Sequence, residues 1–387
     1  MNNRRHFLKT TGLGFLPAIV SNTSILSSDF NKKKFTSPPI VRLYGDSDVL
    51  EPIDYLRKLQ AYNINKTIQR DQYGEGGTIE DLEKKFEQVT GKERAIYLPT
   101  GTMANQLALS VLSGEKTKVF VQETSHVYRD EADAAQSVFQ KRLMPLAPDQ
   151  AFFTVEQLQR TINNLDQEEV FASGIGAVSI ENPVRRSDGQ FVPINEIQKI
   201  SAYCRRNNIK LHLDGARIYI ASAWSGVLVK EYASYFDTVY ISLYKYLGAM
   251  SGAILCGSKS VIDRIPHLIK VHGGTMYSNW VNAAMALNRL ESIEQSFRDC
   301  RVRANEIFDQ LNKIEGIKIS HLPEGSNIYS LALGKQINGE RFRDALFDNY
   351  KILMRQPNEN NQVKISVNET ILYQDATYII NAFKKCL

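Results

Sequence analysis

Residues 238–256 read TVYISLYKYLGAMSGAILC, and this stretch decides the fold class. Two β-branched or aliphatic runs, Thr238–Ser242 and Gly252–Cys256, flank a loop of small and aromatic residues that carries one charge, on Lys245. Short apolar runs bounded by glycine are typical of strands buried on both faces of a sheet. Because lysine is rarely buried without compensation, either Lys245 reaches solvent or its surroundings use an amine.

The rest of the chain repeats the alternation of short apolar runs and amphipathic helical patterns. Further strands are predicted at Ala95–Leu98, Lys118–Gln122, Ala177–Glu181 and Lys210–Asp214, and helices at Thr102–Ser113 and Ile194–Asn207. This order predicts an α/β fold with a large, mostly parallel sheet.

After about Val271 the pattern changes. Apolar residues spaced by three or four from Ile293 to Leu311 predict a long helix, followed by a smaller α+β region that ends in a helix over Asp375–Lys385. We therefore expect a large domain over 37–285 and a small C-terminal domain over 286–387.

The first 36 residues have the pattern of an export signal. Arg4 and Arg5 precede His-Phe-Leu-Lys, and the apolar stretch Gly12–Val20 and a polar exit follow. This order resembles the twin-arginine export consensus, so we expect export of the folded protein to the periplasm. The apolar run is about half of the roughly 20 residues that span a bilayer, so no permanent transmembrane anchor is expected. A basic amphipathic N-terminus of a cytosolic protein is the alternative.

The formal net charge of +5 belongs to this leader. Removing residues 1–36 takes away six cations and one anion, which leaves the remainder neutral. Charge therefore gives no argument for nucleic acid binding.

The four cysteines are too widely spaced for a metal signature or a disulfide framework, so we expect free thiols and no metal site. They are Cys204, Cys256, Cys300 and Cys386.

Ligands collect at the carboxyl ends of the strands in open parallel sheets, and four predicted strands end in polar or reactive residues. Gly101 and Thr102 open a helix after the first of them. The N-terminus of that helix offers N–H groups to a phosphate, although threonine also caps helices. His126 follows the next strand. It either stacks on a planar ligand and moves a proton, or is an ordinary histidine.

Asp214 ends a third strand, and Arg217 lies in the turn after it. Asp214 either holds a protonated ring nitrogen or caps a helix. A desolvated Lys245 has a lowered pKa and attacks an aldehyde to form a Schiff base. Together the four strand ends supply a phosphate cradle, a stacking ring, a carboxylate and an amine. These are the parts that hold pyridoxal phosphate.

The same segments, in the same order, resemble the fold type I pyridoxal phosphate enzymes of the threonine aldolase and β-eliminating lyase family. They are YGEGGTIEDLE from Tyr73, YLPTGTMAN, ETSHVY, HLDGARIYIA and the Lys245 segment. The resemblance implies the aspartate aminotransferase type of fold. It also implies an obligate dimer with sites at the subunit interface, and we expect a homodimer or homotetramer.

The resemblance implies roles for single residues as well. Lys245 forms the Schiff base, Asp214 pairs with the ring nitrogen, and His126 stacks on the ring. The other implied cofactor contacts are Gly101, Thr102, Met103, Arg217 and Ser242. In the family's aldol reaction the cofactor takes up the charge left on the α-carbon when a β-hydroxy amino acid is cut to glycine and an aldehyde. His126, or a water it orients, is the candidate base for the β-hydroxyl proton.

Several positions depart from the family pattern on the substrate side. Tyr244 stands in place of a serine before the lysine, Val184 in place of a histidine, and Gly45 in place of a serine. Tyr277 replaces an arginine that contacts phosphate, and Lys364 replaces the arginine that binds the α-carboxylate. A lysine gives a point charge where an arginine gives a fork, so the last change affects recognition.

The candidate substrate contacts are Tyr73, Arg185 and Lys364, although Arg185 and Arg186 also fit an exposed surface pair. We expect an exported lyase that acts on a β-hydroxy amino acid. The alternatives are β-elimination, racemisation or transamination with the same cofactor, or a binding protein without activity. The presence of both Asp214 and Lys245 argues against the last alternative.

Overall fold

The computed structural model describes residues 39–387, so the expected export signal lies outside the described residues. Residues Ile40–Leu387 form one unit by their contacts. Within this described part, no helix is both long and apolar enough to cross a membrane.

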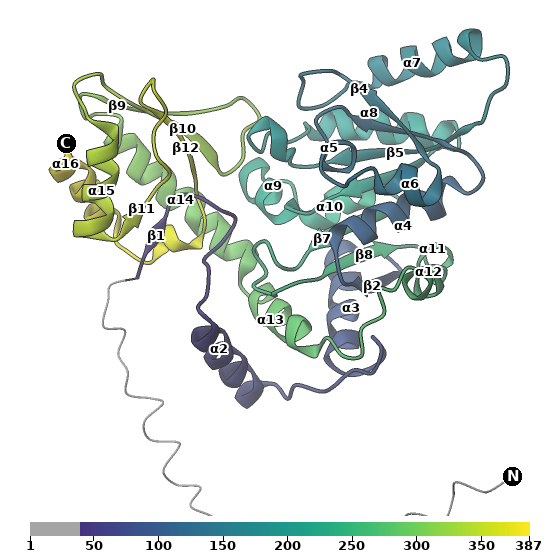
Figure 1. Cartoon of the computed structure of the whole chain (residues 1–387), viewed down its shortest axis with the longest axis horizontal. Helices are drawn as coiled ribbons and strands as arrows, with labels where there is room; N and C mark the ends of the chain where they lie inside the picture. Colours follow the sequence, from purple (N-terminus) through teal and green to yellow (C-terminus); the bar gives the residue numbers. More distant parts are fainter. Residues whose placement is uncertain (1–38) are drawn as a thin grey trace, which may run out of the picture. The chain divides into compact units, whose positions relative to one another are not determined.

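A seven-stranded sheet lies at the centre of the larger part (Figure 1). Its strands are β2 (Arg94–Leu98), β3 (Lys118–Gln122), β4 (Arg142–Leu146), β5 (Ile175–Glu181), β6 (Lys210–Asp214), β7 (Thr238–Ser242) and β8 (Ala253–Gly257). Their order is β2-β8-β7-β6-β5-β3-β4. Strand β8 is antiparallel to both neighbours, and all other pairs are parallel. The predicted α/β class with a mostly parallel sheet is confirmed.

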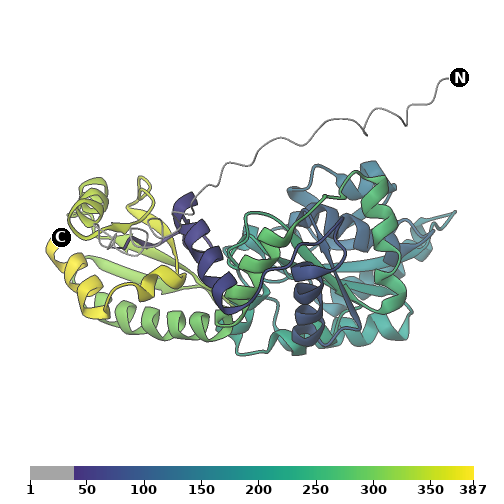
Figure 2. The same cartoon turned by 90° about the horizontal axis from the view of Figure 1, so that it is seen from below.

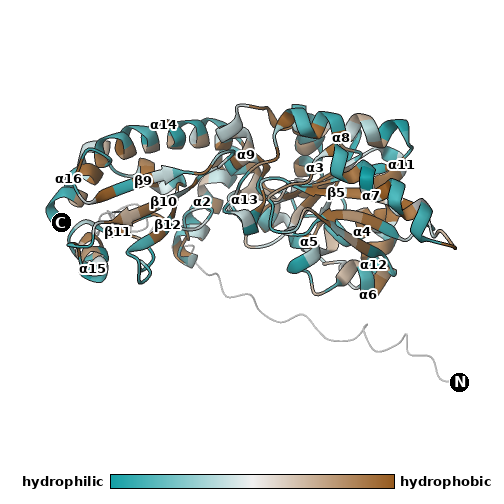
Figure 3. Cartoon of the chain, turned by 90° about the horizontal axis from the view of Figure 1, so that it is seen from above, coloured by the Kyte–Doolittle hydropathy of each residue, from teal (hydrophilic) through white to brown (hydrophobic). Residues whose placement is uncertain are grey.

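Helices cover both faces of this sheet. In β7, Val239 and Ile241 belong to the same apolar core as α3 (Gly77–Thr90), whereas Tyr240 between them packs in the core with α4 (Gly101–Ser113). Strands β3, β7 and β8 are buried along their whole length, which explains why they read as continuous apolar runs. In Figure 3 the strands are largely hydrophobic and helices such as α14 carry many hydrophilic residues.

The remaining elements of the larger part connect these strands or flank the sheet. Between strands lie α5 (His126–Arg129), α6 (Ala134–Phe139), α7 (Val155–Glu168), η1 (Arg185–Ser187), α8 (Ile194–Arg206), α9 (Ile218–Ser225) and α10 (Val229–Ser234). Helices α11 (Lys259–Ile262) and α12 (Ile265–Val271) follow β8. Helix α13 (Trp280–Leu290) packs against both α3 and α2 (Pro52–Asn65).

The C-terminal part is built on the long helix α14 (Ile293–Leu311), which has the bounds that its apolar spacing predicts. This helix runs along a three-stranded antiparallel sheet (Figure 2). The sheet contains β9 (Ile317–His321), β10 (Ile328–Leu333) and β12 (Gln362–Ser366), and α15 (Gly339–Tyr350), η2 (Glu369–Leu372) and α16 (Ala376–Cys386) complete this part. Strand β1 (Val41–Arg42) pairs in parallel with β11 (Ile352–Leu353). The domain boundary near residue 285 stays a prediction.

The four cysteines are free thiols, as expected. Cys204, Cys256 and Cys300 are buried in the core, and Cys386 is partly buried.

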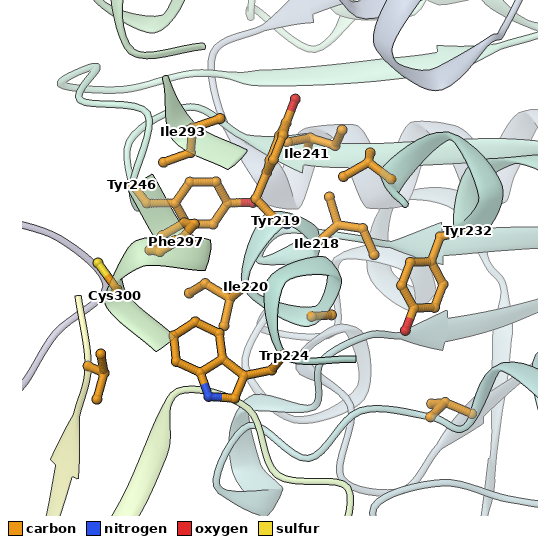
Figure 4. Packing of buried hydrophobic residues seen from close by; sticks show 14 of the residues in the cluster. Ile218, Tyr219, Ile220, Trp224, Tyr232, Ile241, Tyr246, Ile293, Phe297 and Cys300 are labelled. Atoms are coloured by element: carbon orange, nitrogen blue, oxygen red, sulfur yellow. The ribbon is translucent and has the colours of Figure 1, made fainter. Parts of the chain in front are cut away.

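An aromatic cluster fixes the backbone beside Lys245 to the C-terminal part. The Tyr246 ring packs edge-on against Phe297 of α14 and Tyr219 of α9, with centroids 5.5 and 5.9 Å apart (Figure 4). Trp224 of α9 contacts the same Phe297 ring at 6.4 Å. All four rings are buried, and Trp224 Nε1 also donates to the Tyr329 hydroxyl of β10 at 3.1 Å, so both packing and a hydrogen bond hold this junction.

Removing the central ring of this cluster tests its contribution. Phe297→Ala is expected to lower the free energy of unfolding by about 3–5 kcal/mol, because it leaves a cavity among buried rings. Urea denaturation of purified variants measures the change. Phe171→Ala is the matched control, because the Phe171 side chain is 93% exposed, and its midpoint is expected to stay unchanged. Equal effects of the two substitutions would contradict the assignment.

Candidate active site

A cavity of about 260 Å³ lies at the carboxyl ends of β2, β3, β6 and β7. It is lined by five of the residues that the sequence singled out. They are Gly101, Thr102, His126, Asp214 and Lys245. The sheet therefore brings together at one edge the phosphate cradle, the ring, the carboxylate and the amine.

Lys245 lies in the loop between β7 and β8, and its side chain is half-buried. Ser47 Oγ donates to the Lys245 carbonyl at 2.8 Å, which holds the loop from the N-terminal side. Burial and the positive charge of Arg217 lower the pKa of the Lys245 amine to about 8. About a tenth of this amine is therefore neutral, and nucleophilic, at pH 7, far more than for an ordinary lysine.

Asp214 ends β6 with 2% of its surface exposed. Its Oδ2 accepts from Asn105 Nδ2 at 2.9 Å and its Oδ1 from the Ala216 N–H at 3.2 Å. Since a carboxylate accepts about four hydrogen bonds, Asp214 keeps capacity for a donor in the cavity.

His126 begins α5, directly after β3 and its turn. Its Nδ1 lies 2.9 Å from Glu131 Oε1, and this hydrogen bond raises the pKa of His126. Glu181 at the end of β5 accepts the backbone N–H groups of His126 and Arg185 at 2.7 and 2.9 Å. Glu181 thus fixes the start of α5, and Glu131 orients the imidazole ring.

The N-terminus of α4, where the sequence predicts a phosphate site, forms one end of the cavity. The Thr100 side chain caps the helix by accepting from the Met103 N–H at 3.2 Å. Within residues 39–387, the N–H groups of Gly101 and Thr102 have no partner. A Cβ at position 101 would lie 1.9 Å from the Tyr240 hydroxyl, so only glycine fits there. Met103 does not line the cavity, and its N–H belongs to the cap.

Arg217 lies deep beside the cavity rather than in its lining. Its Nε and a terminal nitrogen donate to the two carboxylate oxygens of Asp46 at 2.8 and 2.9 Å. Such a forked pair fixes the guanidinium plane. A larger cavity of about 650 Å³, lined by Asp46, Ser47 and Arg289, meets Lys245 from this side.

Other predicted residues do not line this cavity. Ser242 is fully buried at the end of β7. The exposed Arg185 and Arg186 both pair with Asp130, at 3.4 and 2.5 Å. Lys364 Nζ lies 2.9 Å from Asp188 Oδ2. The roles of Arg185 and Lys364 in substrate binding stay predictions.

Tyr73 is 57% exposed and lies edge-on to the Tyr277 ring, with centroids 5.3 Å apart. The Tyr73 N–H also donates to the Tyr277 carbonyl at 2.8 Å. The two tyrosines therefore form one surface feature outside the cavity of this chain, and a substrate contact of Tyr73 also stays a prediction.

Sequence reasoning missed four residues that support the site: Asp46, Asn105, Glu131 and Glu181. Two of them carried a usable signal. Asn105 is one helical turn after Gly101 in the quoted PTGTMAN, and Glu131 follows His126 by five residues. Asp46 pairs with Arg217, which is 171 residues away in the sequence, so no local pattern indicates that contact.

The residues present fit pyridoxal phosphate by the chemistry of their donors and acceptors. The cavity joins an amine of lowered pKa, a buried carboxylate without a cation on it, and a helix N-terminus with free N–H groups. These match an aldehyde, a protonated ring nitrogen and a phosphate in turn.

Comparisons with known proteins agree with this chemistry. A family model described as "Beta-eliminating lyase" matches residues 53–331. A low-specificity L-threonine aldolase of Candida albicans is 34% identical over 230 residues, which cover 59% of this chain and 61% of that protein. The chain thus matches less than two thirds of that relative's length.

A second relative and one solved structure extend the comparison. An alanine racemase of Cochliobolus carbonum is 32% identical over 237 residues, 61% of this chain and 59% of the relative. A structure from Listeria monocytogenes, described provisionally as an L-allo-threonine aldolase, superposes with a TM-score of 0.74 at 25% identity. It covers 90% of this chain and 97% of that one.

The lowered pKa of Lys245 predicts a pH dependence. Only the neutral amine attacks an aldehyde, so the rate at which the cofactor-free protein binds pyridoxal phosphate should rise with pH and level off above about 8. Arg217→Met removes a cation and leaves Asp46 unpaired, and both changes raise the pKa of Lys245. The rise should then move to higher pH in stopped-flow absorbance.

Arg298→Met is the control for this measurement, because Arg298 is an exposed arginine of α14. Its profile is expected to match that of the unchanged protein. An Arg217→Met profile identical to the control would show that Arg217 does not act on the lysine.

Proposed function

The chain belongs to the β-eliminating lyase family, and we propose that it is a pyridoxal phosphate-dependent lyase that cleaves a β-hydroxy amino acid to glycine and an aldehyde. The family and fold type that the sequence resembles are confirmed. The observation that carries the proposed reaction is the single cavity in which Lys245, Asp214, His126 and the start of α4 meet.

Each group has a separate task in this proposal. The Lys245 amine would hold the cofactor through its aldehyde carbon, with loss of water, and Asp214 would accept a hydrogen bond from the protonated ring nitrogen. The free N–H groups of Gly101 and Thr102 bind the phosphate at the positive end of the helix dipole. When bound, the cofactor supplies an electron sink for the charge left on the substrate α-carbon.

His126 is the proposed base for the β-hydroxyl proton. Glu131 lies at hydrogen-bond distance from Nδ1 and so places a proton there, which leaves the lone pair of a neutral ring on Nε2. The proton accepted at Nε2 then gives an imidazolium that the Glu131 carboxylate stabilises. Removal of that proton is the step that releases the aldehyde from the α-carbon.

Racemisation is the second candidate reaction, because a relative that matches 61% of the chain is an alanine racemase. A racemase removes and returns a proton at the α-carbon and releases no aldehyde. The same cavity residues serve both reactions, which differ in the bond that is broken at the α-carbon. The products therefore distinguish the two reactions.

We also propose that the protein works as a homodimer or homotetramer. Tyr244 and Met250 line the cofactor cavity and are 47% and 66% exposed. Large apolar side chains at the rim of a site are typical of a surface that another subunit covers.

The first prediction of this proposal concerns the products. The purified protein with pyridoxal phosphate is expected to show a visible absorption band that shifts on addition of glycine, and to release acetaldehyde from L-threonine or L-allo-threonine. A coupled alcohol dehydrogenase assay measures the aldehyde, and chiral chromatography of alanine measures racemisation.

Lys245→Ala is the control, since it should abolish the band and borohydride-stable labelling. Racemised alanine without aldehyde would replace the lyase proposal by the second candidate. No band in the unchanged protein would overturn the cofactor assignment.

We propose, from the pattern of residues 2–20, that the protein is exported by the twin-arginine route. Replacing Arg4 and Arg5 together by lysine keeps the charge and is expected to retain the protein in the cytoplasm. Fractionation of cells that express each form measures this. The control is a form in which Lys32 and Lys33 are replaced by arginine, and it is expected to be exported. An equal distribution of all forms between the cytoplasm and the periplasm would contradict the proposal.

A further inference from the structure

One carboxamide, that of Asn105 on α4, lies between two carboxylates. Its Nδ2 donates to Glu131 Oε1 at 2.7 Å and to Asp214 Oδ2 at 2.9 Å. Asn105 is fully buried, and acceptor atoms of Glu131, Asp214 and His126 all lie within 4.8 Å of one another. Asn105 thus links two carboxylates with different tasks. Asp214 is the proposed partner of the ring nitrogen, and Glu131 orients His126.

The orientation of this amide is fixed from behind. Asn105 Oδ1 accepts from His212 Nε2 at 3.0 Å, and His212 Nδ1 accepts from Thr238 Oγ1 at 2.8 Å. Burial lowers the pKa of His212 to about 4, so the ring is neutral. Because the amide nitrogen donates to the two carboxylates, the amide oxygen faces His212 Nε2, and this ring nitrogen carries the proton. The His212 contact thus holds the amide nitrogen toward both carboxylates.

A carboxamide suits this place better than other side chains. Its nitrogen carries two hydrogens and no charge, so it serves two anions and neutralises neither. A lysine or arginine here would compete with a cationic ring for Asp214. A hydroxyl has one hydrogen and would donate to only one of the two carboxylates, and two buried carboxylates that face each other without a shared donor favour uptake of a proton.

We infer that Asn105 is a positioning residue that keeps Asp214 charged for the cofactor ring while Glu131 stays bound to His126. This inference rests on the proposed use of pyridoxal phosphate but not on the reaction that follows. Without the amide, Glu131 and Asp214 face each other with no shared donor, and one of them takes up a proton. A protonated Asp214 no longer favours the charged form of the ring nitrogen.

The test is a double-mutant cycle read out by cofactor binding in the absence of any amino acid. Asn105→Leu keeps the approximate volume of the side chain and removes both donors. It is expected to raise the dissociation constant for pyridoxal phosphate about tenfold or more, a change of about 1.4 kcal/mol. Equilibrium dialysis and the visible band of the lysine-bound cofactor measure this, and urea denaturation of the cofactor-free form checks folding.

Glu131→Gln completes the cycle. With that charge removed, Asp214 has no anionic neighbour across the amide. The change in log Kd caused by Asn105→Leu should therefore be less than half as large in the Glu131→Gln protein as in the unchanged protein. Equal effects in both backgrounds would overturn the inference, because a role in packing alone gives additive changes. If Asn105→Leu alone folds poorly, Asn105→Ser, which keeps only one donor hydrogen, replaces it in both backgrounds.

Gln106→Leu is the matched control, since Gln106 follows Asn105 on α4 and makes none of these contacts. Its cofactor affinity is expected to match the unchanged protein, and a loss as large as that of Asn105→Leu would overturn the inference. An unchanged protein that binds no cofactor would instead refute the proposed function. The two failures are therefore distinguishable.

Discussion

The site depends on holding the Asp214 carboxylate out of water without neutralising it. A buried charge is costly unless hydrogen bonds replace its hydration. Asp214 obtains them from the Asn105 amide and the Ala216 backbone, neither of which is a cation. The nearby Arg217 is engaged by Asp46 instead. The negative charge therefore stays available to a cation that arrives from outside the protein.

The reversal of chain direction at β8 places the amine beside that carboxylate. Because β8 is antiparallel to β7, the chain turns back within ten residues, whereas a parallel connection needs a crossover of a dozen or more. Lys245 lies in this turn, close to the end of β7. The Ser47 hydroxyl and the packing of Tyr246 hold the turn from two sides. A flexible side chain thus starts from a rigid backbone.

The sequence was sufficient for the elements whose signal is local. Strands β3, β6 and β7 have the predicted bounds, because continuous apolar runs mark strands buried on both faces. Strand β4 was missed, since Pro145 interrupts its pattern, and a proline is tolerated there because β4 is an edge strand. The long helix α14 was found because its three-and-four spacing never breaks.

The meeting of Gly101, Asp214 and Lys245 at one cavity was predictable for the same reason, because the carboxyl ends of neighbouring parallel strands lie at one edge of the sheet. The supporting residues were not. Asn105 and Asp214 are 109 residues apart, and the bond between them depends on how α4 packs over the sheet. The surroundings of the predicted substrate residues were harder still to predict. Lys364 pairs with Asp188, and no spacing in the sequence indicates that ion pair.

The pairing of β1 with β11 has a consequence for synthesis. The N–H groups of Val41 and Leu43 donate to the carbonyls of Lys351 and Leu353, and the same segment then supplies Asp46 to Arg217. These residues are synthesised early, whereas their partner strand β11 is synthesised near the end of the chain. The lysine turn and its arginine thus reach their final setting only after translation has passed residue 353. A polypeptide that ends before residue 352 lacks the strand that pairs with β1, and with it the contact that positions the Asp46 segment beside Arg217.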